Sequence, residues 1–226
     1  MYYFQNTSYK KYMYNYVLFD LDGTLVDSSE GILNSAQYAL NQCGVKEDNI
    51  ERLKVFIGPP LKETFIAVYG MSEEQATHAC NVFRMYYSEK GKLQCHLYDD
   101  IVTMLSTLKK SGKTLIVATS KPTVFSQDIL DRLQISQFFD DIVGSNMDNS
   151  RSKKSEIINY ILEKYRIEDK SQVVMVGDKS HDLIGASQCG ISAIGVSYGF
   201  GTVEELLGEP HEKIVDTTRE LLEILR

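Results

Sequence analysis

Two acidic residues directly follow a short apolar run near the start of the chain. The run is Tyr16–Phe19, and the acidic segment is Asp20-Leu21-Asp22-Gly23-Thr24. An apolar run of this length predicts a buried strand, and open parallel sheets bind ligands where their strands end. Two carboxylates there can hold a divalent cation and share the work of nucleophile and proton carrier. Gly23 would allow a sharp turn and bring its N–H close to an anion; the alternative is an acidic turn without function.

Strand-like and helix-like segments alternate along most of the chain. Most of the strand-like segments are continuously apolar, as expected when helices cover both faces of a parallel sheet. The predicted strands are Tyr16–Asp20, Thr114–Thr119, Asp141–Gly144, Gln172–Gly177, Ser192–Val196 and Lys213–Val215. The predicted helices among them are Tyr98–Lys110, Pro122–Leu133, Lys153–Tyr165, His181–Cys189 and Thr217–Leu225. This alternation predicts an α/β fold with a doubly wound, Rossmann-like parallel sheet.

The segment between the first strand and the helix at Tyr98 breaks this alternation. It shows helical periodicity in Glu30–Cys43, Glu47–Phe56, Leu61–Tyr69 and Ser72–Lys90, and no convincing strand. An all-α helical bundle inserted beside the acidic residues is expected to act as a cap that excludes water and selects substrate; a static structural bundle is the alternative. We therefore predict an α/β core at 14–26 and 94–226, a cap at 27–93, and an N-terminal extension at 1–13 that has no role in the core.

Charge and composition argue against several classes of protein. The 226 residues have a net charge of −7, a hydrophobic fraction of 43% and no Lys/Arg stripe, so we expect a packed core and no nucleic-acid partner. The sequence has no apolar run of the roughly 18 residues that a membrane span needs, and no signal-peptide pattern at the N-terminus. The four cysteines, Cys43, Cys80, Cys95 and Cys189, form no Cys-x-x-Cys pair and fit free thiols in a reducing compartment. We expect a cytoplasmic protein that is a monomer or a weak homodimer.

Two further segments could bind an anion. Thr119-Ser120-Lys121 follows an apolar run, and its hydroxyls and backbone N–H groups could hold phosphate oxygens, although a helix N-cap explains it equally well. Lys153-Lys154 opens a predicted helix, where the macrodipole disfavours a cation. A lysine at that place needs an anion or a carboxylate nearby, unless the pair is simply solvated.

A second acidic pair follows another predicted strand. Gly177-Asp178 ends the apolar run Val174–Val176, and Asp182 comes four residues after Asp178. This spacing suits one direct ligand and one supporting carboxylate around a hard cation. The simpler alternative for Asp178 is a helix N-cap.

Taken together, these segments resemble the four motifs of the haloacid dehalogenase superfamily, in order and in context. Asp20–Thr24 resembles the first motif, Thr119 the second, Lys154 the third, and Gly177 through Asp182 the fourth. The helical insertion resembles the small cap of the phosphoglycolate-phosphatase-like branch, and the resemblance covers about residues 14–226. Lys153 is a rival for the third motif, but the family pattern places its lysine just before the helix whose apolar face begins at Ile157.

The resemblance implies hydrolysis of a small phosphorylated metabolite through an aspartyl phosphate. Asp20 would be the nucleophile and Asp22 the acid and base. Asp22 also favours phosphate substrates over halides, because a halide leaves without a proton. Thr119, Lys154 and the N–H groups of Gly23 and Ser120 would bind the phosphate. Mg²⁺ would be held by Asp20, the carbonyl of Asp22 and Asp178, with Asp182 supporting that shell or pairing with Lys154.

Substrate choice is expected to depend on the cap, where the sequence says least. Lys62 and Arg84 could face the leaving group, or could be solvated or structural cations. The candidate substrates are phosphoglycolate, nucleoside 5′-monophosphates and pyrophosphate. The alternatives are a phosphosugar mutase of the β-phosphoglucomutase type, a regulatory or binding protein without catalysis on the same fold, and a phosphonate-cleaving enzyme with Lys62 as its Schiff base.

Overall fold

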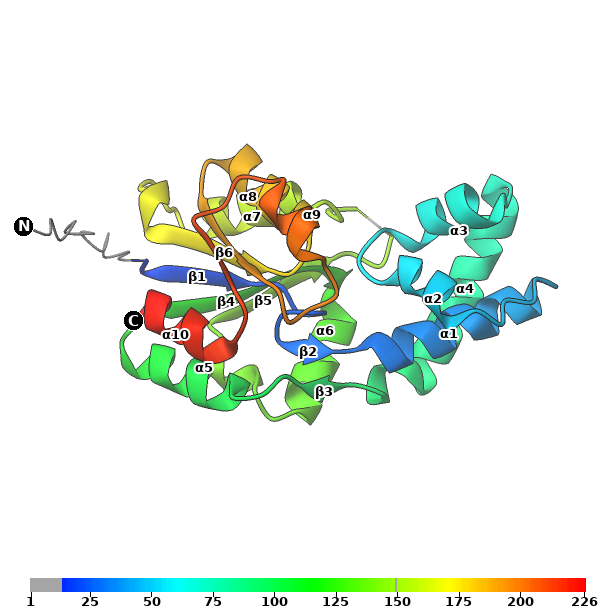
Figure 1. Cartoon of the computed structure of the whole chain (residues 1–226), viewed down its shortest axis with the longest axis horizontal. Coiled ribbons are helices and arrows are strands. Elements are labelled where there is room, and N and C mark those ends of the chain that lie inside the picture. Colours follow the sequence, from blue (N-terminus) through cyan, green and yellow to red (C-terminus); the bar gives the residue numbers. More distant parts are fainter. Residues whose placement is uncertain (1–13, 149) are drawn as a thin grey trace, which may run out of the picture.

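The strand that precedes the acidic segment lies in the middle of a six-stranded sheet. The structure is a computed structural model that describes residues 14–148 and 150–226. The predicted extension at 1–13 lies outside the described residues. The strands follow the order β5-β4-β1-β6-β7-β8, and all neighbours pair in parallel (Figure 1). The predicted α/β, Rossmann-like fold is therefore confirmed.

The observed strands match the predicted ones to within a few residues. They are β1 Tyr16–Phe19, β4 Thr114–Pro122, β5 Asp141–Ser145, β6 Val173–Gly177, β7 Ser192–Val196 and β8 Lys213–Val215. The largest difference is at the end of β4, which extends through Pro122, where the sequence predicts the start of a helix. The register between β4 and β5 shifts between Ala118 and Pro122, and the extended backbone of Pro122 continues the strand.

Alternate residues of the buried strands face two separate cores. Val17, Phe19 and Val117 point to one face of the sheet, which packs against α5 Ile101–Lys110, α6 Thr123–Arg132 and α10 Thr218–Leu225. Leu18 and Ile116 point to the other face, against α7 Lys154–Lys164, α8 Ser180–Cys189 and the short α9 Val203–Leu207. Both faces of β1 are thus covered, which explains why its sequence is apolar without alternation.

A separate group of helices lies beyond the carboxyl ends of the strands (Figure 1). It consists of α1 Ser29–Gln42, α2 Ile50–Leu53, α3 Leu61–Tyr69 and α4 Glu73–Glu89, with short 3-10 turns at Lys54–Phe56 and Gly91–Leu93. We call α1–α4 the helical block. Its longest helix begins with a capping box, in which Ser72 and Gln75 bond reciprocally. The predicted helix at 47–56 is in fact the short α2 followed by a 3-10 turn.

Among the described residues, two short strands, one short α-helix and the 3-10 turns at Ser136–Phe138 and Lys170–Gln172 were not predicted from the sequence. β2 Val26–Asp27 and β3 His96–Leu97 pair in antiparallel fashion, where the chain enters and leaves the helical block. Two-residue strands carry no periodicity, and α9 is too short for a helical pattern. β2 and β3 matter because they pair the two segments of chain that connect the sheet to the helical block.

Candidate active site

The carboxyl ends of three adjacent strands bring the predicted motifs together. β1 lies between β4 and β6, and Phe19 pairs with Val117 on one side and Val176 on the other. Asp20, Thr119 and Asp178, which follow these positions, therefore meet at one edge of the sheet. Their exposed fractions are only 5%, 2% and 0%. The parallel register, rather than proximity in the sequence, assembles this site.

Lys154 lies in the centre of this cluster and is 4% exposed. Its Nζ is 2.8 Å from Asp20 Oδ1, 2.8 Å from Asp182 Oδ1 and 2.8 Å from the carbonyl oxygen of Ala118. Lys153 is exposed and serves as the residue before the first turn of α7. Lys154, rather than Lys153, therefore contacts the first acidic motif.

Asp178 is held from two sides and packs directly against Gly23. Its Oδ1 accepts from Thr24 Oγ1 at 3.2 Å, and its Oδ2 accepts from the N–H of Phe200 at 2.8 Å. A Cβ at position 23 would lie 2.2 Å from Asp178 Oδ2, and Gly23 has φ +84°. Only glycine fits this position without strain or collision.

One predicted role of Gly23 needs correction. The sequence assigned its N–H to phosphate, but in the structure this N–H donates to the carbonyl oxygen of Val26 at 2.8 Å. The reason is local, because the loop after β1 folds back on itself in a tight turn that uses this donor. Gly23 is therefore required by close packing, and its N–H is already occupied.

The pKa values of the buried carboxylates are shifted in different directions. Burial raises the pKa of Asp20, although Lys154 acts in the opposite direction. Burial, together with the charges of Asp182 and Asp20, raises the pKa of Asp178 well above its ordinary range. Burial also opposes the charge of Asp182, but Lys154 and His181 outweigh it and lower the pKa of Asp182. The single positive charge of Lys154 thus does not balance the negative charges that Asp20 and Asp178 would carry when ionised.

These residues fit a hard divalent cation. Carboxylate and carbonyl oxygens are the donors that Mg²⁺ prefers, and such an ion would supply the additional positive charge that Asp20 and Asp178 require. Among the described residues, the ligand atoms of Asp20, His181 and Asp182 lie within 4.8 Å of one another, and Asp178, the direct ligand predicted from the sequence, is not part of this group. His181 was not predicted as a site residue, since a histidine between Asp178 and Asp182 carries no signal of its own.

Asp22 is bound by two donors that the sequence did not reveal. Ser28 Oγ donates to Asp22 Oδ1, and Lys121 Nζ bonds to Asp22 Oδ2 at 2.5 Å. Lys121 comes from the end of β4, two residues after Thr119, whose Oγ1 accepts from the N–H of Lys121. The position of Lys121 directly after the second motif was the one signal that could have identified it.

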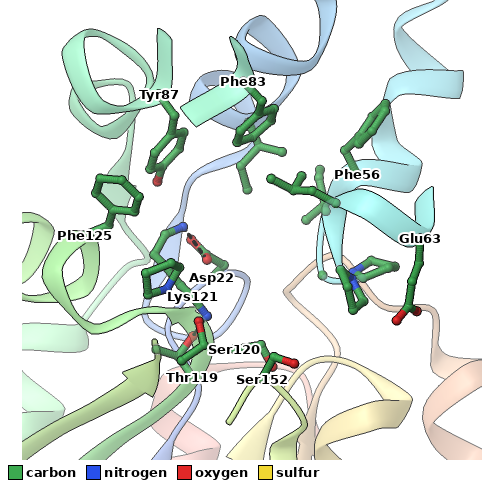
Figure 2. Close-up of a pocket in the computed structure, with 18 of the residues that line it drawn as sticks. Asp22, Phe56, Glu63, Phe83, Tyr87, Thr119, Ser120, Lys121, Phe125 and Ser152 are labelled. Carbon is green, nitrogen blue, oxygen red and sulfur yellow. Dashed lines mark hydrogen bonds and ion pairs between the residues drawn. The ribbon is translucent and has the colours of Figure 1, made fainter. Parts of the chain in front are cut away.

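A cavity of about 360 Å³ opens above these residues, between the sheet and the helical block. Figure 2 shows Asp22, Thr119, Ser120 and Lys121 on its floor, and aromatic side chains on its walls. The aromatic residues on these walls are Phe56, Phe83, Tyr87 and Phe125, with apolar contributions from Ile32, Ile57 and Leu61, and Phe200 also lines the cavity. The cavity therefore combines a polar floor with an apolar, aromatic upper part.

Both cap cations named from the sequence border this cavity. Lys62 bonds to Glu73 at 2.5 Å, and its side chain is 42% exposed. Arg84 lies on α4, next to the aromatic Phe83. Lys62 already has an anionic partner, which weakens its case as a binding group for a second charge on the substrate.

Comparison with known proteins identifies the class to which this fold and site belong. Residues 17–196 match the haloacid dehalogenase-like hydrolase family, so the chain belongs to that family. A predicted phosphatase from Clostridium acetobutylicum has the same fold, with a TM-score of 0.89 and 44% identity over 93% of this chain and 97% of that chain. Over residues 14–148 and 150–226, no helix combines the length and the apolar character needed to cross a membrane.

The curated relatives are named for several different activities. A 5′-nucleotidase of Pseudomonas aeruginosa is 42% identical over 85% of this chain and 87% of its own length. The tyrosine-protein kinase PtkA of Mycobacterium tuberculosis is 38% identical over 83% of this chain, but over only 64% of its own length. A phosphoglycolate phosphatase of Vibrio parahaemolyticus is 27% identical over 92% of this chain and 95% of its own. The phosphoglycolate-phosphatase-like branch, predicted from the helical insertion after the first motif, is thus confirmed.

Proposed function

We propose that this protein is a Mg²⁺-dependent phosphatase that hydrolyses a small phosphorylated metabolite through an aspartyl-phosphate intermediate. The observation that carries the proposal is the buried contact between Lys154 and Asp20, a residue that lines the cavity. The carboxylate of Asp20 thus has a fixed positive charge beside it, and a phosphate in the cavity would meet both. Membership in the hydrolase family and the names of two relatives support the same chemistry.

The reaction would proceed in two halves. In the first, an oxygen of Asp20 forms a bond to phosphorus, the ester P–O bond breaks, and Asp22 gives its proton to the leaving oxygen. In the second, Asp22 takes a proton from water, the water oxygen attacks phosphorus, and the bond to Asp20 breaks. The products are an alcohol and inorganic phosphate, and Asp22 regains its proton.

The remaining residues would bind the transferring phosphoryl group. Lys154, the Thr119 hydroxyl and the Ser120 backbone N–H would bind its oxygens and would stabilise the charge that develops there. A Mg²⁺ ion would be held by Asp20, the carbonyl of Asp22 and Asp178, and Asp182 would support it by pairing with Lys154. When bound, the ion neutralises carboxylate charge and polarises phosphate oxygens.

Among the candidate substrates, the cavity favours nucleoside 5′-monophosphates. Its upper walls carry four aromatic rings, which can stack on a planar base. Phosphoglycolate would instead place its carboxylate, a second anionic group besides the phosphate, in this part of the cavity, where Lys62 is already paired with Glu73. The name of the Pseudomonas relative supports the same choice. The helical block, predicted as a cap at 27–93, would then close over the nucleoside.

A panel of phosphate esters tests this proposal. Purified protein should release phosphate from nucleoside 5′-monophosphates with a higher kcat/KM than from phosphoglycolate or pyrophosphate, and EDTA should abolish the release. The Asp20→Asn variant controls for contaminating phosphatases. Absence of Mg²⁺-dependent release from every ester would contradict the proposal. Transfer of the phosphoryl group to a sugar phosphate, without release to water, would favour the mutase.

A further inference from the structure

Asp20 and Asp22, the two carboxylates of the first motif, form ion pairs with different lysines. Lys154 bonds Asp20 and Asp182, whereas Lys121 bonds Asp22. With Ser28 on the other oxygen, both oxygens of Asp22 have a donor. The carboxylate of Asp22 is therefore fixed in one orientation at the cavity floor.

Lys121 is also enclosed by the helical block. Its Nζ lies 4.9 Å from the centre of the Tyr87 ring, which belongs to α4. The Tyr87 ring in turn meets Phe125 of α6 edge-on, at 5.6 Å and 71°. Figure 2 shows the end of the Lys121 side chain beside Asp22, with Tyr87 above both. Only 8% of the Lys121 side chain is exposed, so the ammonium group depends on these two neighbours.

Through Lys121, the helical block is connected to Asp22, the residue assigned to proton transfer. Lys121 comes from β4, Asp22 from the loop after β1, and Tyr87 from the helical block. An ammonium group is attracted to an aromatic face, and more strongly when water is excluded. When Tyr87 covers Lys121, the ammonium group is held in the direction of Asp22.

We propose that Lys121 is a positioning residue for proton transfer, which holds the Asp22 carboxylate toward the leaving oxygen while Tyr87 of the helical block holds Lys121. The proposal rests on the proposed phosphatase function. As the ester P–O bond breaks, the proton of Asp22 passes to the leaving oxygen, and Asp22 becomes a carboxylate. Lys121 stabilises that carboxylate until a proton from the attacking water restores the acid. Lys121 itself exchanges no proton in this cycle.

The leaving group provides the test. An alkoxide such as the 5′-oxygen of a nucleoside needs a proton in order to leave, whereas p-nitrophenolate does not. Rapid-quench measurements with wild type and Lys121→Met would record the first-turnover burst of nucleoside from a nucleoside 5′-monophosphate, and of p-nitrophenolate from its phosphate ester. The variant should slow the nucleoside burst by about 100-fold and leave the p-nitrophenolate burst close to the wild-type rate. Lys121→Arg, which keeps the charge, should recover part of the nucleoside burst.

The outcomes separate this inference from the proposed function. If wild type shows no Mg²⁺-dependent burst with either ester, the proposed function itself fails. If wild type is active and Lys121→Met slows both bursts equally, or neither, then Lys121 is only structural and the inference is overturned. Lys110→Met, which removes an exposed lysine of α5, is the matched control for loss of one charge and should behave as wild type.

A second pair of variants keeps the test decisive if Lys121→Met does not fold. Tyr87→Phe retains the ring beside Lys121 but removes the hydroxyl, which also contacts Lys121, and Tyr87→Leu removes both. Tyr87→Leu should lower the ratio of the nucleoside burst to the p-nitrophenolate burst by about tenfold, and Tyr87→Phe should lower it less. A wild-type ratio in Tyr87→Leu would refute the link between the helical block and Asp22.

Discussion

Replacement of Lys154 by methionine removes the central positive charge of the site while keeping most of the side-chain volume. In the folded protein, this ammonium group bonds Asp20, Asp182 and the carbonyl of Ala118, each at 2.8 Å. The side chain is almost fully buried, so water cannot replace it without rearrangement. The variant therefore leaves two buried carboxylates and one buried carbonyl without their shared partner.

The cost to stability follows from that arrangement. Removal of one partner of a buried ion pair costs about 3–5 kcal/mol, because an uncompensated charge stays behind. Proton uptake by Asp20 would reduce this cost, since burial already raises its pKa. For a protein of this size, the loss corresponds to a decrease in Tm of roughly 6–20 °C. The kcat should fall about 100-fold or more, as when a donor to a developing oxyanion is lost.

The neighbouring lysine offers a matched control. Lys153→Met removes the same charge one residue earlier, at an exposed position, and should change stability by no more than about 0.5 kcal/mol. Tm is measured by differential scanning fluorimetry and kcat by phosphate release. Adding Asp182→Asn to Lys154→Met should recover part of the lost Tm, because the double variant leaves one buried charge fewer. Equal Tm values for Lys154→Met and Lys153→Met would refute the reasoning.

Three further predictions concern the nucleophile, the turn and the aromatic wall. Asp20→Asn should abolish turnover, and wild type with beryllium fluoride should form an adduct on Asp20 that crystallography detects; a variant with normal kcat would remove the nucleophile. Gly23→Ala should cost about 1–3 kcal/mol and weaken Mg²⁺ binding, because its Cβ would lie 2.2 Å from Asp178 Oδ2; thermal unfolding and Mg²⁺ titration check this, and wild-type values in both would contradict it. Phe125→Ala should raise KM for a nucleoside 5′-monophosphate about tenfold and hardly change KM for phosphoglycolate; an equal rise for both esters would argue against base stacking.

Local sequence patterns were sufficient to predict the sheet. The continuous apolar runs at β1 and β6 and the helical periods between strands specify a doubly wound fold, since only a sheet covered on both faces buries such runs. The same patterns located Asp20 and Asp178 at strand ends. The short β2 and β3 were missed, because two residues cannot display a period.

Local sequence rules do not determine whether Lys153 or Lys154 contacts Asp20. Both stand at the start of one helix, and no local rule separates them. In the structure, Lys154 points into the cluster and Lys153 lies at the surface. Lys153 precedes α7 with extended backbone and Lys154 is the first residue of the helix, so the packing of α7 against its neighbours in space determines which lysine reaches Asp20.

The sequence by itself determined the class of fold, the strand-end acids and the order of the four motifs, because these depend on periodicity and on residue type. Only the tertiary structure decided that Lys121 bonds Asp22 beneath Tyr87, and that the N–H of Gly23 is already occupied. The contacts of Lys121 join β4, the loop after β1 and α4, whereas the bond of Gly23 depends on how the loop after β1 folds back on itself. Their energies depend on distance and burial in the folded chain, which no local pattern encodes.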